Sequence, residues 1–99
     1  MKAYKAKATS KLESAEKLTM LDGPKNGCAT IQAIFYSSDN PSRSLYLYDR
    51  DGDMISFPLP GQLEKKATAI QPVTVSLPLF FMDEDGGSGN QIIVFGQME

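Results

Sequence analysis

The feature that most constrains the fold of this chain is a two-residue alternation of apolar and polar side chains that begins at residue 29. Successive side chains of a β-strand point to opposite faces of a sheet, so the alternation predicts half-buried strands. In the first run we expect Ile31, Ala33 and Phe35 to share one face, and we interpret the longest run as a single strand. The runs are ATIQAIFYS (29–37), SLYLYD (44–49), MISF (54–57), PVTVSLPLFFM (72–82) and NQIIVFG (90–96).

Clusters of turn-forming residues separate these runs, and each supplies the Gly, Pro, Asn and Asp that tight turns require. Short strands at this spacing, in a chain of 99 residues, predict an all-β, single-domain antiparallel β-sandwich. Pro78 cannot donate a ladder hydrogen bond, so the longest run should form an edge or bend there. We expect a core that includes Val75, Leu77, Ile92 and Val94. The turn clusters are LDGPKNG (21–27), SSDNPS (37–42), PLPG (58–61) and DEDGGSGN (83–90).

The first twenty residues differ in charge from the rest of the chain. Residues 1–17 carry five lysines against two glutamates, a balance of +3, whereas the remainder balances to −5 within the net charge of −2. Ser10 to Glu13 form a possible helix capping box, but KAYKAKATSKL also alternates as an extended segment would. We therefore divide the chain into a basic arm or short helix at 1–20 and a β-sandwich domain at 21–99. No stretch has the length and apolarity of a signal peptide or membrane helix, which favours a soluble protein made in a cytoplasm.

Composition argues against most kinds of catalysis. The chain has no histidine, which excludes Ser-His-Asp and Cys-His catalysis and histidine-ligated zinc. Cys28 is the single cysteine, so neither an intrachain disulfide nor a cysteine-ligated zinc site can form. A pair of carboxylates remains a formal alternative. We predict a non-enzyme without a cofactor.

The segment DRDGD carries aspartates at alternate positions, Asp49, Asp51 and Asp53. A calcium-binding loop needs its glycine after the third acidic ligand and a glutamate six residues later. Here Gly52 precedes the third aspartate, and Pro58 stands six residues beyond the glycine. The pattern favours a hairpin turn with Gly52 in the left-handed conformation, and a weak cation site is the alternative.

A second apolar face is the strongest functional signal in the residues. Both faces of 45–48 are large and hydrophobic, and two apolar side chains of the longest run lie opposite its predicted core face. One core can bury only one face of a strand, so the other face predicts a covered sheet or an interface. The predicted interface residues are Tyr46, Tyr48, Phe80 and Met82, together with Lys2, Lys5 and Lys7 of the basic arm. Stacking on a sugar is an alternative, whereas direct nucleic-acid binding is not expected because only Arg43 and Arg50 lie near the aromatic residues in sequence.

From residue 17 to 97 the layout KLTMLDGP, CATIQAIFYSS, SLYLYDRDGDMISFPLP and PVTVSLPLFFMDEDGGSGNQIIVFG resembles the small jelly-roll proteins of tailed-phage virions. The resemblance implies a β-sandwich of jelly-roll type and a capsid decoration (cement) protein, or a related head or tail component. It further implies a homo-oligomer, with a trimer favoured, that contacts the major capsid protein or another virion protein. Such a protein would reside in the virion after assembly in the host cytoplasm, away from membranes. It supplies no catalytic motif.

Two other functional classes remain open at this point. One is a small ligand-binding β module that stacks a carbohydrate on Tyr36, Tyr46 or Tyr48. The other is a binding protein that regulates one enzyme. A stable oligomer would favour the assembly hypothesis, whereas a monomer stabilised by sugar would favour the binding module.

Overall fold

The computed structural model describes residues 2–9, 17–37, 45–55, 67–83 and 89–99. These residues form eight β-strands. In this part of the chain no helix is long and apolar enough to span a bilayer. The strands are β1 (Ala3–Thr9), β2 (Thr19–Met20), β3 (Cys28–Ser37), β4 (Leu45–Tyr48), β5 (Met54–Ile55), β6 (Thr68–Ser76), β7 (Phe80–Asp83) and β8 (Gln91–Met98).

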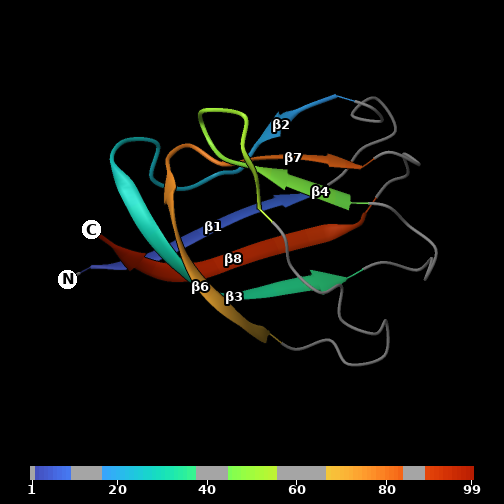
Figure 1. The fold of residues 1–99 in the computed structure, drawn as a ribbon. Helices are drawn as coiled ribbons and strands as arrows, with labels where there is room; N and C mark the ends of the chain where they lie inside the picture. The colour runs from blue at the N-terminus through green and yellow to red at the C-terminus, as the bar shows by residue number, and fades with distance from the viewer. Residues whose placement is uncertain (1, 10–16, 38–44, 56–66, 84–88) are drawn as a thin grey trace.

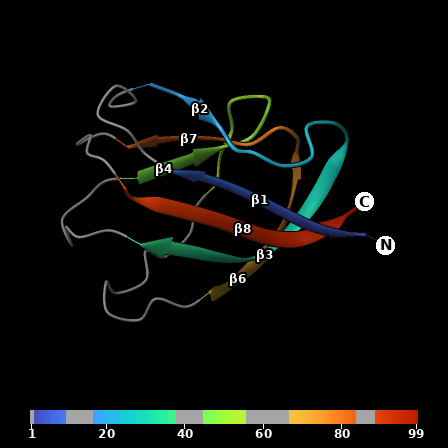
Figure 2. The same cartoon turned by 180° about the vertical axis from the view of Figure 1, so that it is seen from behind.

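The strands form two four-stranded sheets (Figure 1). Sheet 1 has the order β1-β8-β3-β6, and sheet 2 has the order β2-β7-β4-β5. All six pairings are antiparallel: β1 with β8, β8 with β3 and β3 with β6 in sheet 1, and β2 with β7, β7 with β4 and β4 with β5 in sheet 2. The view from behind shows the two chain ends side by side at one end of sheet 1 (Figure 2), where the Met98 amide donates to the Lys2 carbonyl oxygen over 2.8 Å. The prediction of an all-β chain with antiparallel sheets is confirmed.

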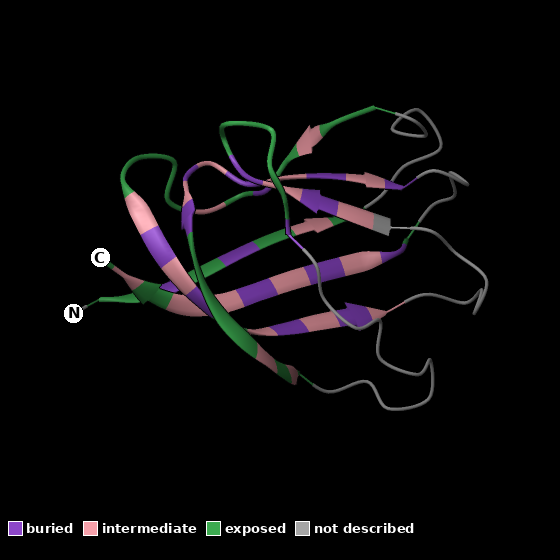
Figure 3. Ribbon diagram, in the orientation of Figure 1, coloured by how far each residue is buried: buried purple, intermediate pink, exposed green. Residues whose placement is uncertain are grey.

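Buried side chains from both sheets form a single hydrophobic cluster. Figure 3 shows buried positions alternating with partly exposed ones along the central strands, as a half-buried strand requires. Val75, Leu77, Ile92 and Val94 are all buried, which confirms the predicted core. The largest fully buried apolar side chains come from both sheets and from the segments that follow β2 and β6, namely Tyr4, Leu21, Ile31, Ile34, Leu47, Leu77, Leu79, Phe81, Ile92 and Val94.

A β-bulge in β3 changes the face that the sequence pattern predicted. Ile31 pairs with Gly96 and Ala33 pairs with Phe95, so Gln32 is an extra residue without a partner on β8. An extra residue shifts the side-chain alternation by one position. Ile31 is buried, and the next buried side chains are Ile34 and Tyr36. The expectation that Ala33 and Phe35 share the inward face of Ile31 is therefore wrong.

The longest alternating run is two strands in different sheets, and the prediction of one strand at 72–82 is wrong. β6 ends at Ser76 in sheet 1, and β7 begins at Phe80 in sheet 2. The chain changes sheets around Pro78, where the sequence predicted a bend. The alternation of buried side chains nevertheless continues through the segment that connects the two strands. The buried residues are Val75, Leu77, Leu79 and Phe81. Val73, which lies earlier in the same alternating run, is 37% exposed.

The edge strand β6 carries a further irregularity. Its pairing with β3 passes from Ala69 to Val73, so Ile70, Gln71 and Pro72 have no register partners on β3. Proline has no amide hydrogen, and an unpaired stretch of an edge strand is where it can be accommodated. This stretch of β6 lies opposite the hairpin that joins β4 and β5, as the cavity described below shows.

The N-terminal segment is part of sheet 1 over the residues that the structure describes. Tyr4 and Ala6 of β1 are buried, and Lys7 forms a bridge with Asp22 through backbone hydrogen bonds of 3.0 and 2.7 Å. Residues 3–9 are thus extended, as the alternation of KAYKAKATSKL indicated, and one face of the segment packs into the core. The capping-box helix predicted after Ser10 lies mostly outside the described residues.

Candidate functional site

An apolar surface covers the outer side of sheet 2. Tyr46 pairs with Met82, and Tyr48 pairs with Phe80. Directly opposed residues of an antiparallel pair project from the same face, so these four side chains lie together. Phe80 also pairs with Met20 of β2, and Tyr48 also pairs with Met54 of β5. We call this set the Tyr–Met face; it comprises Met20, Tyr46, Tyr48, Met54, Phe80 and Met82.

The burial of neighbouring residues identifies the Tyr–Met face as the outer one. Leu47, Ile55 and Phe81, which alternate with it along the strands, are buried in the core. Met20 is 44% exposed and Met54 is 59% exposed, and these two occupy opposite edges of sheet 2. The four central side chains are partly buried. One row of apolar side chains thus crosses all four strands of the sheet.

The structure separates the seven predicted interface residues into two groups. Tyr46, Tyr48, Phe80 and Met82 meet on the Tyr–Met face, whereas the lysines belong to sheet 1 or its N-terminal end. Lys5 pairs with Phe95, and its Nζ atom lies 5.9 Å from the centre of that ring. Lys2 and Lys7 are exposed, with Lys7 two positions from Lys5 and therefore on the same side of β1. Their role in an interface stays a prediction.

Sequence reasoning missed Met20 and Met54. Met20 belongs to a strand of two residues, which is too short to show an alternating pattern, and Met54 is the first residue of the short run at 54–57. The signal for Met54 was the hairpin itself, because the turn after Tyr48 fixes the register that brings Met54 opposite it. Met20 carried no comparable signal, because β2 pairs with a strand that is distant in sequence.

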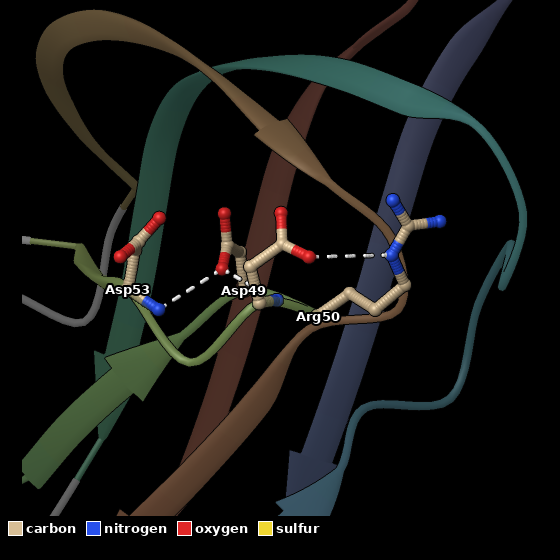
Figure 4. Close-up of polar contacts among 4 residues, drawn as sticks. Asp49, Arg50 and Asp53 are labelled. Carbon is tan, nitrogen blue, oxygen red and sulfur yellow. Dashed lines mark hydrogen bonds and ion pairs between the residues drawn. The ribbon is translucent and has the colours of Figure 1, made fainter.

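The aspartate-rich segment forms the predicted hairpin turn. The Asp49 amide donates to the Asp53 carbonyl oxygen over 3.0 Å, and the Gly52 amide donates to the Asp49 carbonyl oxygen over 3.1 Å. Gly52 has a φ of 85°, in the left-handed region that glycine adopts without steric cost. The Asp49 Oδ1 atom accepts the amides of Asp51 and Asp53 over 2.9 and 3.1 Å (Figure 4), so this carboxylate fixes the turn from within.

The three aspartates also approach one another closely. One carboxylate oxygen from each of Asp49, Asp51 and Asp53 can be chosen so that all lie within 4.8 Å of each other. Arg50 lies beside them, with its Nε atom 3.8 Å from the Asp51 Oδ1 atom (Figure 4). The turn by itself explains this geometry, and a weak cation site at the three aspartates stays the alternative to it.

The second acidic cluster, DEDGGSGN, is described only at its ends. Asp83 and Asn90 are both buried, and the Asn90 Nδ2 atom donates to the Asp83 Oδ2 atom over 2.8 Å. This hydrogen bond links the end of β7 to the start of β8. Residues 84–88 lie outside the described part of the chain.

The Tyr4 phenol and the Cys28 thiol lie at structural positions away from the Tyr–Met face. Tyr4 is 1% exposed, and burial raises the pKa of its phenol to about 12. Its hydroxyl has no hydrogen-bond partner among the described residues. Cys28 is partly buried at the start of β3. Neither lies on the Tyr–Met face, whose side chains are suited to binding.

Comparison with known proteins gives no match for this chain: no protein-family model, no curated protein and no solved structure is significantly similar to it. The resemblance to small virion proteins therefore stays a prediction, as do its implied partners and location. No family is assigned to the chain, and its function has to be inferred from the geometry of the two sheets.

Proposed function

We propose that this protein is a non-enzymatic structural protein that stabilises an assembly through its Tyr–Met face. The observation that carries the proposal is the apolar row Met20–Phe80–Tyr48–Met54, which crosses all four strands of sheet 2. Burying one large apolar side chain contributes roughly 1.5–3 kcal/mol, so several together can offset the ordering cost of association. Tyrosine and methionine suit such a contact, because both are common in interfaces and methionine adapts its shape to a partner.

A jelly-roll fold is the more specific architecture that we propose. Its support is the nested pairing of β1 with β8, β2 with β7, β3 with β6 and β4 with β5. A long antiparallel hairpin that is rolled into two sheets produces this pairing, and jelly rolls of eight strands are frequent in capsid proteins. We accordingly propose a phage virion as the assembly, with the chain as a capsid decoration or related head or tail component that acts as a homo-oligomer, most simply a trimer.

The carbohydrate-binding alternative is weaker on this surface. A sugar site needs polar groups that hydrogen-bond the hydroxyls around the stacking ring. Tyr48 is flanked instead by Phe80 and Met54, and Tyr46 is paired with Met82. These apolar neighbours match a protein partner better than a sugar.

A matched pair of phenylalanines tests the proposal. Phe80 and Phe95 are both partly exposed, and they lie on the outer sides of sheet 2 and sheet 1 respectively. We expect the intact chain to sediment as an oligomer, Phe80→Ser to shift it toward the monomer, and Phe95→Ser to leave it assembled. Circular dichroism would show whether each variant is folded. A monomeric parent, or dissociation by Phe95→Ser alone, would contradict docking through the Tyr–Met face.

The virion assignment needs its own measurement, because an oligomer by itself does not identify the assembly. Mass spectrometry of purified phage particles that encode this chain should find it in a fixed ratio to the major capsid protein. Its absence from the particles would remove the virion from the proposal and leave the assembly surface to be matched with another partner.

A further inference from the structure

A cavity of about 470 Å³ lies between the β4–β5 hairpin and the edge strand β6. This volume is in the range that small-molecule and side-chain binding pockets occupy. One wall comes from the turn and from β5, and the other comes from the irregular stretch of β6 that includes Pro72. The lining residues are Asp49, Asp53, Met54, Ile55, Gln71, Pro72, Val73, Thr74 and Val75.

Two carboxylates of this cavity have no cationic partner among the residues that the structure describes. Asp49 is only 8% exposed, and its Oδ1 atom accepts two backbone amides. Its second oxygen, Oδ2, has no hydrogen bond or ion pair with any residue that the structure describes. Asp53 also has no ion pair among the described residues, since the basic groups that form such pairs, Lys25 and Arg50, contact other aspartates. Asp53 is exposed, whereas Asp49 is buried, and buried charges in proteins are normally paired. The Asp49 carboxylate therefore gives the cavity a negative charge that a ligand can neutralise.

The remaining lining is mostly apolar. Ile55, Pro72, Val73 and Val75 supply hydrocarbon surface, and Gln71 and Thr74 supply uncharged polar atoms. Carboxylate oxygens of Asp49 and Asp53 lie within 4.8 Å of each other, so one ammonium nitrogen can contact both. A bare metal ion fits this lining less well. Calcium prefers six to eight oxygen ligands, and an ion would leave the apolar walls and most of the cavity volume without a contact.

We propose that this cavity binds an organic ammonium group carried on an apolar stem, with Asp49 and Asp53 holding the cation and Val73 and Val75 contacting the stem. A free alkylamine and the side chain of a lysine share this chemistry. The proposal concerns a different part of the surface from the central residues of the Tyr–Met face, and it does not depend on the protein being a virion component.

Calorimetric titration with n-hexylammonium chloride tests the proposal directly. We expect saturable binding to the intact chain, and n-hexanol of the same length should bind far more weakly because it lacks the charge. Asp53→Asn should weaken binding of the amine at least about tenfold, since hydrogen bonds to charged groups are among the stronger ones. Asp22→Asn is the matched control and should leave binding unchanged, because Asp22 is paired with Lys25 and does not line the cavity.

Two further arms make the outcome decisive. The affinities of Nα-acetyl-lysine amide and n-hexylammonium are compared. Tighter binding of the lysine derivative identifies a lysine side chain as the natural source of the ammonium group, and tighter binding of n-hexylammonium identifies a free alkylamine. The NMR chemical shifts of the amide and methyl groups of Ile55, Val73 and Val75 should change when the amine is titrated into the intact chain. This measurement locates the site without any variant. Equal affinity for hexanol, preference for calcium over the amine, or shifts elsewhere in the chain would each overturn the proposal. Failure here would leave the sedimentation results of the Tyr–Met face untouched.

Discussion

At the scale of single residues, the least expected feature is the phenol of Tyr4. It lies in the core with its hydroxyl unpartnered among the described residues, opposite Gly96 on the neighbouring strand. A large ring beside a glycine fills space that the glycine leaves empty in the sheet. The ring is therefore favourable at this position, whereas the buried hydroxyl is a cost.

Removing that hydroxyl should stabilise the protein. We expect Tyr4→Phe to raise the free energy of unfolding by about 1–2 kcal/mol, because an unsatisfied buried polar group costs about that much. Urea denaturation monitored by circular dichroism measures the change. Tyr4→Leu is the informative comparison, because it also removes the hydroxyl but loses the ring, and it should destabilise. A loss of stability in Tyr4→Phe would mean that the hydroxyl has a partner.

The same residue predicts a response to alkaline pH. The pKa of Tyr4 is raised from 10.0 to about 12 in the folded protein, so below pH 10 the phenol is protonated in both states and its titration does not change stability with pH. Between pH 10 and 12 the unfolded chain releases this proton while the folded chain keeps it, which favours unfolding by up to about 2–3 kcal/mol. Denaturation midpoints across this interval should fall more steeply for the parent than for Tyr4→Phe. Parallel profiles would contradict the assignment.

At the scale of elements, the bulge in β3 depends on its neighbour in β8. A Cβ atom added to Gly96 would lie 2.0 Å from the Thr30 carbonyl oxygen and 3.0 Å from the Ile31 Cα atom. These are backbone atoms that cannot move aside by a change of rotamer. The bulge and the glycine are therefore linked, and together they place Ile34 and Tyr36 in the core.

We expect Gly96→Ala to destabilise the protein by at least about 2 kcal/mol, in the range of overpacked core substitutions that force the backbone to shift. Gly27→Ala is the control, since it has a φ of 83° but nothing within 4 Å of the added Cβ. The control should cost only about 1–2 kcal/mol for the left-handed conformation. Thermal denaturation of both variants separates steric clash from conformational strain. A harmless Gly96→Ala would show that β3 and β8 can separate at the bulge.

At the scale of the whole molecule, the N-terminal strand contributes to the core as well as to the charge. Tyr4 and Ala6 face inward, and Lys5 and Lys7 face outward from the same strand. β1 is also an edge strand, and its backbone is joined to Asp22 at Lys7. The basic character of the segment is thus carried by a structural strand of sheet 1.

Deleting residues 1–9 should therefore unfold much of the protein, because it removes a large buried ring from a domain whose total stability is typically about 5–15 kcal/mol. Lys5→Gln with Lys7→Gln is the matched control, since it removes the charges and keeps the strand. We expect the control to retain the circular dichroism spectrum and melting temperature of the parent. A truncated chain that stays folded would show that the segment behaves as the separable arm that its charge pattern first indicated.

Local pattern was sufficient to predict the strands that alternate and the turn at Asp49 to Gly52, because side-chain alternation and glycine conformation depend on neighbours in sequence. It also predicted the four central residues of the Tyr–Met face, since the second apolar face is visible in the strands themselves. The cavity beside β6 was not predictable, because its two walls are separated by more than ten residues whose mutual position depends on the pairing of the sheets.

The sequence by itself therefore determined an all-β chain, the four core residues that it named and a surplus of apolar surface. Only the tertiary structure decided which strands share a sheet, that the run at 72–82 passes from one sheet to the other, and that Gln32 reverses the inward face of β3. It also decided that Met20 and Met54 extend the Tyr–Met face to both edges. The physical reason is that strand register is set by contacts between distant segments, and a shift of one residue moves every side chain to the opposite face.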